Sequence, residues 1–222
     1  MKKITLLFLS LLFANALALS PYTGSYDLYA NTKMGNLKIG KAALYLEMNG
    51  SEFTFTTEAK TESLWRALYD YSRYEKSSGN ETDGQVINNY FSVIEKDYEI
   101  TIVTDKNYAL SSSGEEWEIK PGLLVDPLSV YLALSNDMLK NPDQSEFTYQ
   151  VVDQDGVKYL KFNAVAQENI SINDNEIDTI RVTCDELELT LNLSVKDNFQ
   201  PVKIHKVNGK TEFTMLLIEF RG

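Results

Sequence analysis

The chain has 222 residues, with 21 Lys and Arg against 32 Asp and Glu, and its formal net charge is −11. Such an acidic protein is poorly suited to binding nucleic acid or an anionic lipid surface, because phosphate contacts need Lys and Arg. The single cysteine, Cys184, excludes an intramolecular disulfide, so the fold depends on its hydrophobic core. The length suits one domain with a sizeable core.

Residues 1–18 have the three-part pattern of a secretory signal peptide. Two lysines precede an apolar stretch from Ile4 to Leu19, and small residues near its end suit a signal peptidase that cleaves after Ala18. Retention as a membrane anchor is the alternative, because a span needs about 20 apolar residues. No cysteine lies near the cleavage point, so we do not expect a lipoprotein. We expect a periplasmic protein of residues 19–222, with no stable membrane insertion after cleavage.

Apolar and polar residues alternate along most of the remaining chain, which is typical of strands with one buried face. The clearest example is Leu187–Val195. Just upstream, Ile180–Cys184 alternates in the opposite phase, so we predict a bulge or tight turn at Asp185-Glu186. Cys184 is in phase with the apolar side chains, which predicts a buried structural thiol.

Four dipeptides that end in glycine predict tight turns between strands. They are Asn49-Gly50, Asp83-Gly84, Asp155-Gly156 and Asn208-Gly209, and each adjoins alternating segments. Strands joined in this way form an antiparallel meander, for which we count roughly ten to thirteen strands. Because so large a sheet usually curls or closes, the predicted fold is mainly β: a single curved antiparallel sheet, as an incomplete barrel or meander.

Two segments lack this alternation. Asp126–Lys140 is predicted to be a helix, since Asp126 can cap it, Pro127 suits its first position and Asn141-Pro142 ends it. Most of its surface is apolar, so we expect it to be buried against the sheet. Glu62–Tyr69 is predicted to form one short helical turn. No linker or repeat divides the chain, so we predict a single domain.

Sequence motifs for catalysis or metal binding are absent. The one histidine, His205, opposes the apolar phase of its predicted strand, so we place it on the exposed face. The acids Asp153, Asp155, Asp174 and Glu176 have some features of a calcium loop, but the first two are better explained by a hairpin turn. We therefore expect no metal and no cofactor. Paired carboxylates of a hydrolase stay open, because distant strands can bring acids together.

Aromatic residues are abundant, with 13 Tyr, 10 Phe and 2 Trp. Packing between neighbouring strands explains many of them. A curved sheet with a buried helix also leaves room for an apolar cavity, and tyrosines suit its mouth because the ring is buried while the hydroxyl stays in water. The side chains that we predict to line such a cavity are Trp65, Tyr69, Tyr71, Leu128, Tyr131 and Leu132.

The start of the predicted helix, Asp126–Tyr131, resembles the Asp-x-Leu-Ser-x-Tyr signature of an uncharacterised family of exported Gram-negative proteins, domain of unknown function 3108. The glycines Gly35 and Gly40 resemble that family's early glycine pair, and Gln200–Ile204 is similar to its Leu-Pro-Val-Arg-Ile segment. The chain departs from the family in Gln200 and in the apparent lack of a Phe-Asp-Trp-like segment. The resemblance implies a fold and an exported location rather than an activity. The motif residues to which it assigns structural roles are Asp126, Leu128, Ser129, Tyr131, Pro201 and Val202.

Three functions are compatible with this sequence. The first is non-enzymatic binding of an apolar or amphipathic ligand (a lipid, an acyl chain or a lipoprotein anchor) in a hollow between sheet and helix, since the predicted shape is similar to periplasmic lipoprotein carriers. The second is a protein–protein interaction module of the cell envelope with no small ligand. The third is a carboxylate-based glycan or peptide hydrolase. We favour the first and predict no catalytic residues.

Overall fold

The computed structural model describes residues 19–32, 35–62, 65–66, 70–96, 98–105, 107–120, 124–208 and 211–222. The predicted signal peptide and Tyr69 lie outside the described residues. Within them the chain forms one sheet, one α-helix and one 3-10 helix. The elements are β1 (Tyr22–Thr32), β2 (Gly35–Asn49), β3 (Glu52–Thr61), β4 (Ser72–Thr82), β5 (Gln85–Glu95), β6 (Tyr98–Thr104), β7 (Tyr108–Ser111), β8 (Glu116–Glu118), β9 (Leu124–Val125), α1 (Val130–Lys140), β10 (Glu146–Asp153), β11 (Gly156–Ile172), β12 (Asn175–Cys184), η1 (Asp185–Leu187), β13 (Leu189–Ser194), β14 (Gln200–Asn208) and β15 (Thr211–Arg221).

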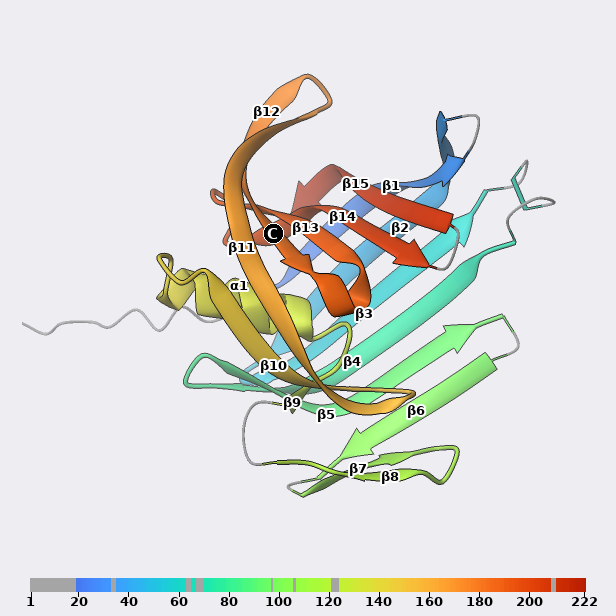
Figure 1. Ribbon diagram of the computed structural model, residues 1–222, viewed down its shortest axis with the longest axis vertical. Coiled ribbons are helices and arrows are strands. Elements are labelled where there is room, and N and C mark those ends of the chain that lie inside the picture. The colour runs from blue at the N-terminus through green and yellow to red at the C-terminus, as the bar shows by residue number, and fades with distance from the viewer. Residues whose placement is uncertain are drawn as a thin grey trace, which may run out of the picture.

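The sheet is a curved meander that does not close (Figure 1). Its 15 strands follow the order β8-β7-β6-β5-β4-β3-β2-β1-β15-β14-β13-β12-β11-β10-β9. Because β1 pairs with β15, the first and last strands lie in the middle of the sheet, and β8 and β9 form its two edges. Among the described strands, β9 and β10 make the one parallel pair. The predicted curved antiparallel sheet is confirmed, and strands as short as β8 and β9 account for a count above the expected range.

Tight turns join the strands at three of the four predicted places, and the fourth, Asn208-Gly209, extends outside the described residues. Gly50 has φ +64° between β2 and β3. Asp83 and Gly84 have φ 52° and 66°, which matches a two-residue turn of the type that fits strand twist. Gly156 closes the β10–β11 hairpin with φ 116°. The 3-10 helix Asp185–Leu187 lies at the predicted change of phase, where it turns β12 back into β13.

The helix begins later than predicted. α1 starts at Val130, and residues 127–129 form a turn in which the Val130 N–H donates to the Asp126 carbonyl at 3.1 Å. The Asp126 carboxylate accepts from the backbone of this turn, so it caps the turn rather than the helix proper. At the predicted helical turn near Glu62, the described residues show a turn closed by the Trp65 N–H on the Glu62 carbonyl at 3.0 Å.

The helix packs inside the curve of the sheet. α1 contacts β5, β10 and β14, and most of its residues are buried. The inward faces of the strands supply the rest of the core, including Leu44, Phe55 and Phe162, which are fully buried. Burial of side chains of this kind stabilises a fold by about 1.5–3 kcal/mol each. A chain without disulfides therefore has a large continuous core.

Side chains bridge the gap between the two edges of the sheet. The Gln150 amide of β10 donates to the Lys120 carbonyl at 3.0 Å and accepts from the Lys120 N–H at 2.9 Å, as a neighbouring strand would. Trp117 of β8 lies against β11, where a Cβ on Gly156 would be 3.2 Å from its ring nitrogen. Nearby, the Tyr98 hydroxyl donates to Gln154 at 3.1 Å. These side chains form a seam that holds the barrel-like shape without a continuous backbone ladder.

We expect Gln150→Leu to weaken this seam. Leucine has a similar size but can neither donate nor accept, so both backbone groups of Lys120 lose their partner at a cost of about 1–3 kcal/mol. Gln167→Leu is the matched control, because that amide is exposed and bonds an exposed Asp178. Urea unfolding of both variants measures the difference, and equal stabilities would contradict the role of the seam.

Candidate functional site

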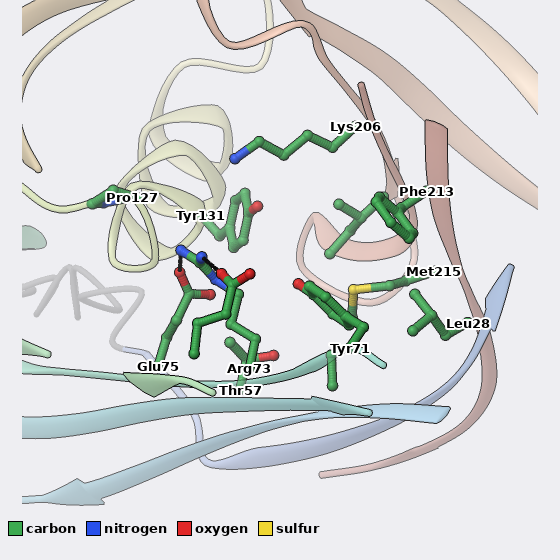
Figure 2. A pocket seen from close by; sticks show the side chains of 13 residues that line it. Leu28, Thr57, Tyr71, Arg73, Glu75, Pro127, Tyr131, Lys206, Phe213 and Met215 are labelled. Carbon is green, nitrogen blue, oxygen red and sulfur yellow. Dashed lines mark hydrogen bonds and ion pairs between the residues drawn. The ribbon is translucent and has the colours of Figure 1, made fainter. Parts of the chain in front are cut away.

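A cavity of about 130 Å³ lies between the N-terminal end of α1 and the inward face of the sheet (Figure 2). Strands from both halves of the chain meet here because β1 pairs with β15. One side of the cavity is apolar and the other is charged. Its lining residues are Leu28, Thr57, Ala59, Tyr71, Arg73, Glu75, Glu95, Pro127, Tyr131, Ile204, Lys206, Phe213 and Met215.

The apolar wall comes from β1 and β15. Leu28 and Met215 are direct partners in the ladder, and Phe213 lies two residues away on the same face. The Phe213 ring stacks on the Tyr71 ring, with centroids 5.5 Å apart and planes at 20°. This contact fixes the position of Tyr71, which precedes β4.

Arg73 holds two carboxylates at the charged side. Its guanidinium donates to Glu75 at 2.7 Å and to Glu95 at 2.6 Å, and all three residues are half-buried. Burial alone would lower the pKa of Arg73, but the Glu75 charge and the hydrogen bonds to both carboxylates raise it. The arginine is therefore a permanent cation. Together the three groups carry a formal charge of −1.

Lys206 is a second cation at this cavity. Its strand partner is Phe213, so it lies on the inward face of β14, and Figure 2 shows its side chain extending across the pocket toward Tyr131. Within the described part of the chain it makes no ion pair. Partial burial lowers the pKa of Lys206 and the nearby Glu75 opposes that shift, although much of the side chain stays exposed. The cavity thus reaches solvent at its Lys206 end.

Two tyrosine hydroxyls also face the cavity. Figure 2 shows the Tyr71 hydroxyl at the end of its ring nearest Tyr131, and the Tyr131 hydroxyl on the side of its ring that faces away from the coils of α1. In the described residues neither hydroxyl has a hydrogen-bond partner. Burial raises the pKa of Tyr71 to about 12, and burial and the Glu75 charge raise that of Tyr131 further above its ordinary value. Both groups therefore stay protonated and can donate.

The predicted cavity residues are distributed over several places. Tyr71 and Tyr131 line the cavity, while Trp65 packs behind it against the cluster of Leu28, Ala30 and Ile39. Leu128 is buried in the main core. Leu132 is also buried and lines a separate cavity of about 30 Å³.

The charged lining residues were not predicted from the sequence. Arg73 and Glu75 face inward because their partners in β3, Ala59 and Thr57, lie on the buried face. Lys206 shares the apolar phase of β14 with Ile204, and this phase was a signal that could have placed it inside. An inward lysine in an otherwise apolar series indicates either a partner or a ligand.

The family-motif residues form a buried polar network behind the cavity. Asp126 is fully buried, and its carboxylate accepts from the backbone N–H groups of Leu128 at 2.7 Å and Ser129 at 2.9 Å. It also accepts from Ser77 of β4 at 2.5 Å, from Asn88 of β5 and from the Ser129 hydroxyl at 2.7 Å. Burial raises its pKa to about 6, against the opposing effect of these hydrogen bonds. The network ties the start of α1 to the sheet.

Two other motif residues also have structural contacts. The Tyr26 hydroxyl donates to the Pro201 carbonyl at 2.6 Å, which joins β1 to β14. Val202 is also buried. Cys184 is 1 % exposed, and burial raises the pKa of its thiol to about 11, so the predicted buried thiol is confirmed.

The four acids considered as calcium ligands are not together. Asp153 and Asp155 pair with Lys158 at the β10–β11 turn, whereas Asp174 and Glu176 lie at the opposite end of β11. Within the described ranges, no group of three or more His, Cys, Asp or Glu side chains is placed to hold a metal ion. The described helices include none with the length and apolar character to cross a membrane.

The fold is similar to solved β-barrel-like structures. One is the crystal structure of a β-barrel-like protein of domain of unknown function DUF1849 from Brucella abortus, with a TM-score of 0.58 at 11% identity over 92% of this chain and 98% of that chain. At this identity the similarity shows the fold alone, that of a β-barrel-like domain of unknown function. No protein-family model matches the sequence, and no curated protein matches it. The resemblance to domain of unknown function 3108 therefore stays a prediction.

Proposed function

We propose that this protein is a non-enzymatic periplasmic binding protein, and that the cavity beside α1 holds the apolar end of an amphipathic ligand. The observation that carries the proposal is a preformed hollow with an apolar wall at Leu28 and Met215 and, at its open end, the cation Lys206, for which the described residues supply no ion-pair partner. Binding sites for small molecules combine apolar linings with a few placed polar groups in this way. The periplasmic location rests on the signal pattern, and membership of the exported family belongs to the same proposal.

The volume of the cavity limits how large a part of the ligand it can enclose. An engineered apolar cavity of about 150 Å³ in another protein binds benzene, and this cavity measures about 130 Å³. Pockets that enclose a drug-sized ligand hold about 300–1,000 Å³. The cavity therefore accommodates a group of about six carbon atoms. A whole lipid or lipoprotein anchor would leave most of its length outside, beyond Lys206.

The carboxylates near the cavity favour binding over hydrolysis. A hydrolase needs one acid that protonates the leaving group and a second that activates the nucleophile. Here Glu75 and Glu95 both bind Arg73. Asp126 has its pKa raised toward neutrality but is fully buried, out of reach of a substrate.

Native mass spectrometry of the full protein purified from the periplasm tests this proposal. We expect a small molecule to be released on denaturation, and its occupancy to fall at least tenfold in Ala59→Leu, because the added carbons enter the cavity. Ala43→Leu is the control, since it makes the same change on the outward face of β2. An empty wild-type protein that also binds no added amphiphile, or equal occupancy in the two variants, would overturn the proposal.

A second candidate, docking of another envelope protein, is favoured by an apolar patch on the outward face of the sheet. Val103 of β6 and Leu110 of β7 are direct strand partners and are 52 % and 47 % exposed. Exposed apolar patches often mark protein interfaces. Leu110→Glu separates the candidates, because it would abolish capture of a partner and leave ligand occupancy unchanged.

A further inference from the structure

The geometry points to a carboxylate on the ligand, held by the Lys206 ammonium and the hydroxyls of Tyr71 and Tyr131. This inference rests on the proposed function and names the chemistry that the same cavity would recognise. The ligand is then a monocarboxylic acid with a compact apolar body, such as a short alkanoate or an aryl alkanoate.

Three side chains that line the cavity, Lys206, Tyr71 and Tyr131, offer hydrogen-bond donors to a ligand. Lys206 has up to three N–H groups, and each phenol has one O–H. In the described part of the chain, these three side chains have no other hydrogen-bond or ion-pair partner. A carboxylate offers two oxygens with about four acceptor sites, and it is the compact anion that such donors match.

The charge at the cavity favours a monoanion over a dianion. Arg73 and Lys206 supply two positive charges, and Glu75 and Glu95 supply two negative charges, so the lining is formally neutral. A carboxylate brings the occupied site to −1, whereas a phosphate monoester would bring it close to −2 beside two fixed carboxylates. Like charges in a partly desolvated site repel strongly, so a carboxylate is preferred to a phosphate.

The donors and the apolar wall lie on different sides of the hollow. Lys206 crosses from β14 toward Tyr131 on α1, while Leu28, Phe213 and Met215 form the wall from β1 and β15 (Figure 2). A ligand can therefore place its head at the exposed Lys206 end and its body against the stacked Phe213 ring. A cavity of about 130 Å³ holds a body of roughly one phenyl ring.

NMR titration of the full mature protein with matched pairs of small molecules tests the assignment. The probes are 3-phenylpropanoate and hexanoate, each compared with the alcohol of the same carbon skeleton. We expect each acid to have a dissociation constant about tenfold to a hundredfold lower than its alcohol, as a charge-assisted hydrogen bond predicts. Chemical-shift changes should centre on Tyr71, Tyr131 and Phe213.

Substitutions identify the side chains that bind the carboxylate. We expect Lys206→Met to remove most of the preference for the acid, because the acid loses a charge-assisted hydrogen bond and the alcohol loses at most a weaker one. Tyr131→Phe should weaken acid binding by about threefold to tenfold, as loss of one hydrogen bond predicts. Lys203→Met is the control: it removes a charge from the outward face of the same strand and should change neither affinity. Lys206 is exposed, so its replacement does not threaten folding.

The outcomes separate this inference from the proposed function. Equal binding of acid and alcohol, or an acid preference that survives Lys206→Met, would overturn the carboxylate assignment and leave the cavity as a binding site. Tighter binding of 3-phenylpropylamine than of the acid would also overturn it, because Glu75 and Glu95 would then be the recognition groups. If neither acid nor alcohol binds, both this inference and the proposed function fail.

Discussion

Asp126→Ala is expected to destabilise the protein by about 3–5 kcal/mol. Asp126 is fully buried, and its carboxylate is the shared acceptor for two backbone N–H groups of the turn that leads into α1. Alanine leaves these donors and the side chains of Ser77 and Asn88 without that partner, and loss of one partner in a buried charged network costs this much. Denaturant unfolding monitored by circular dichroism measures the loss.

Asp126→Asn is the matched variant, because it keeps the shape and one acceptor oxygen. Its new amide can donate to Asn88, whose Oδ1 atom is buried without a partner, if the Asn88 amide rotates. We therefore expect a smaller loss than with alanine. Equal losses in the two variants would show that the charge itself, rather than the acceptor geometry, holds the start of the helix.

The difference in stability between the wild type and Asp126→Asn is expected to depend on pH. The pKa of Asp126 is raised to about 6 in the folded protein from an ordinary 3.8, so the folded state binds this proton more tightly than the unfolded chain does. The contribution of this bound proton to the free energy of unfolding is fully present below pH 4. It is lost as the pH rises through 6, by about 3 kcal/mol in total. Relative to Asp126→Asn, the wild type should lose stability between pH 4 and 7. An opposite slope would show that the five donated hydrogen bonds outweigh burial.

Gly40→Ala is the second substitution with a large expected effect. A Cβ on Gly40 would lie 2.1 Å from the Lys60 carbonyl oxygen and 2.8 Å from the Thr61 Cα, both backbone atoms of β3. The two strands have to separate to admit a methyl group, at a cost of roughly 3 kcal/mol, the upper end of ordinary overpacking. Urea unfolding provides the measurement.

Separation of β2 from β3 in Gly40→Ala would also disturb the cavity. The Thr61 N–H donates to the Tyr71 carbonyl at 2.9 Å, so a shift of the end of β3 moves the tyrosine that stacks on Phe213. Lys41→Ala is the control, because it puts alanine at the next, exposed position, where its ion pair with Glu62 is exposed. If Gly40→Ala is no less stable than Lys41→Ala, the close approach of β2 and β3 is not a constraint.

Local chemistry was sufficient to predict the strands and their turns. Alternating polarity marks which face of a strand is buried, and Asp-Gly or Asn-Gly pairs adopt the positive φ that a two-residue turn needs, as at Asp83-Gly84. The helix was predicted four residues too early, because the Asp126 carboxylate caps a turn that precedes it. That distinction depends on backbone geometry and not on residue type.

The site was only partly predictable from the sequence. Tyr71 and Tyr131 could be predicted to line the cavity, because amphipathic rings suit a cavity mouth. Leu128 and Leu132 were predicted to line the same cavity but lie in the core. The prediction was wrong because a helix with apolar residues on most faces does not indicate which face borders a hollow. Arg73 was not predicted to line the cavity, because its own segment does not determine the register of β4 with β3. It is this register that places Arg73 beside Ala59 on the buried face of the sheet.

The strand pattern, the turns and the buried helix could be predicted from the sequence, because each depends on interactions between residues close together in the chain. The complete fold was needed to see that β1 pairs with β15, and this pairing brings Leu28 to Met215 and Phe213. The fold also places Lys206, more than a hundred residues from Arg73 in the chain, at the same hollow. Such contacts depend on how the whole sheet curves, which is the sum of many small twists that no short segment encodes.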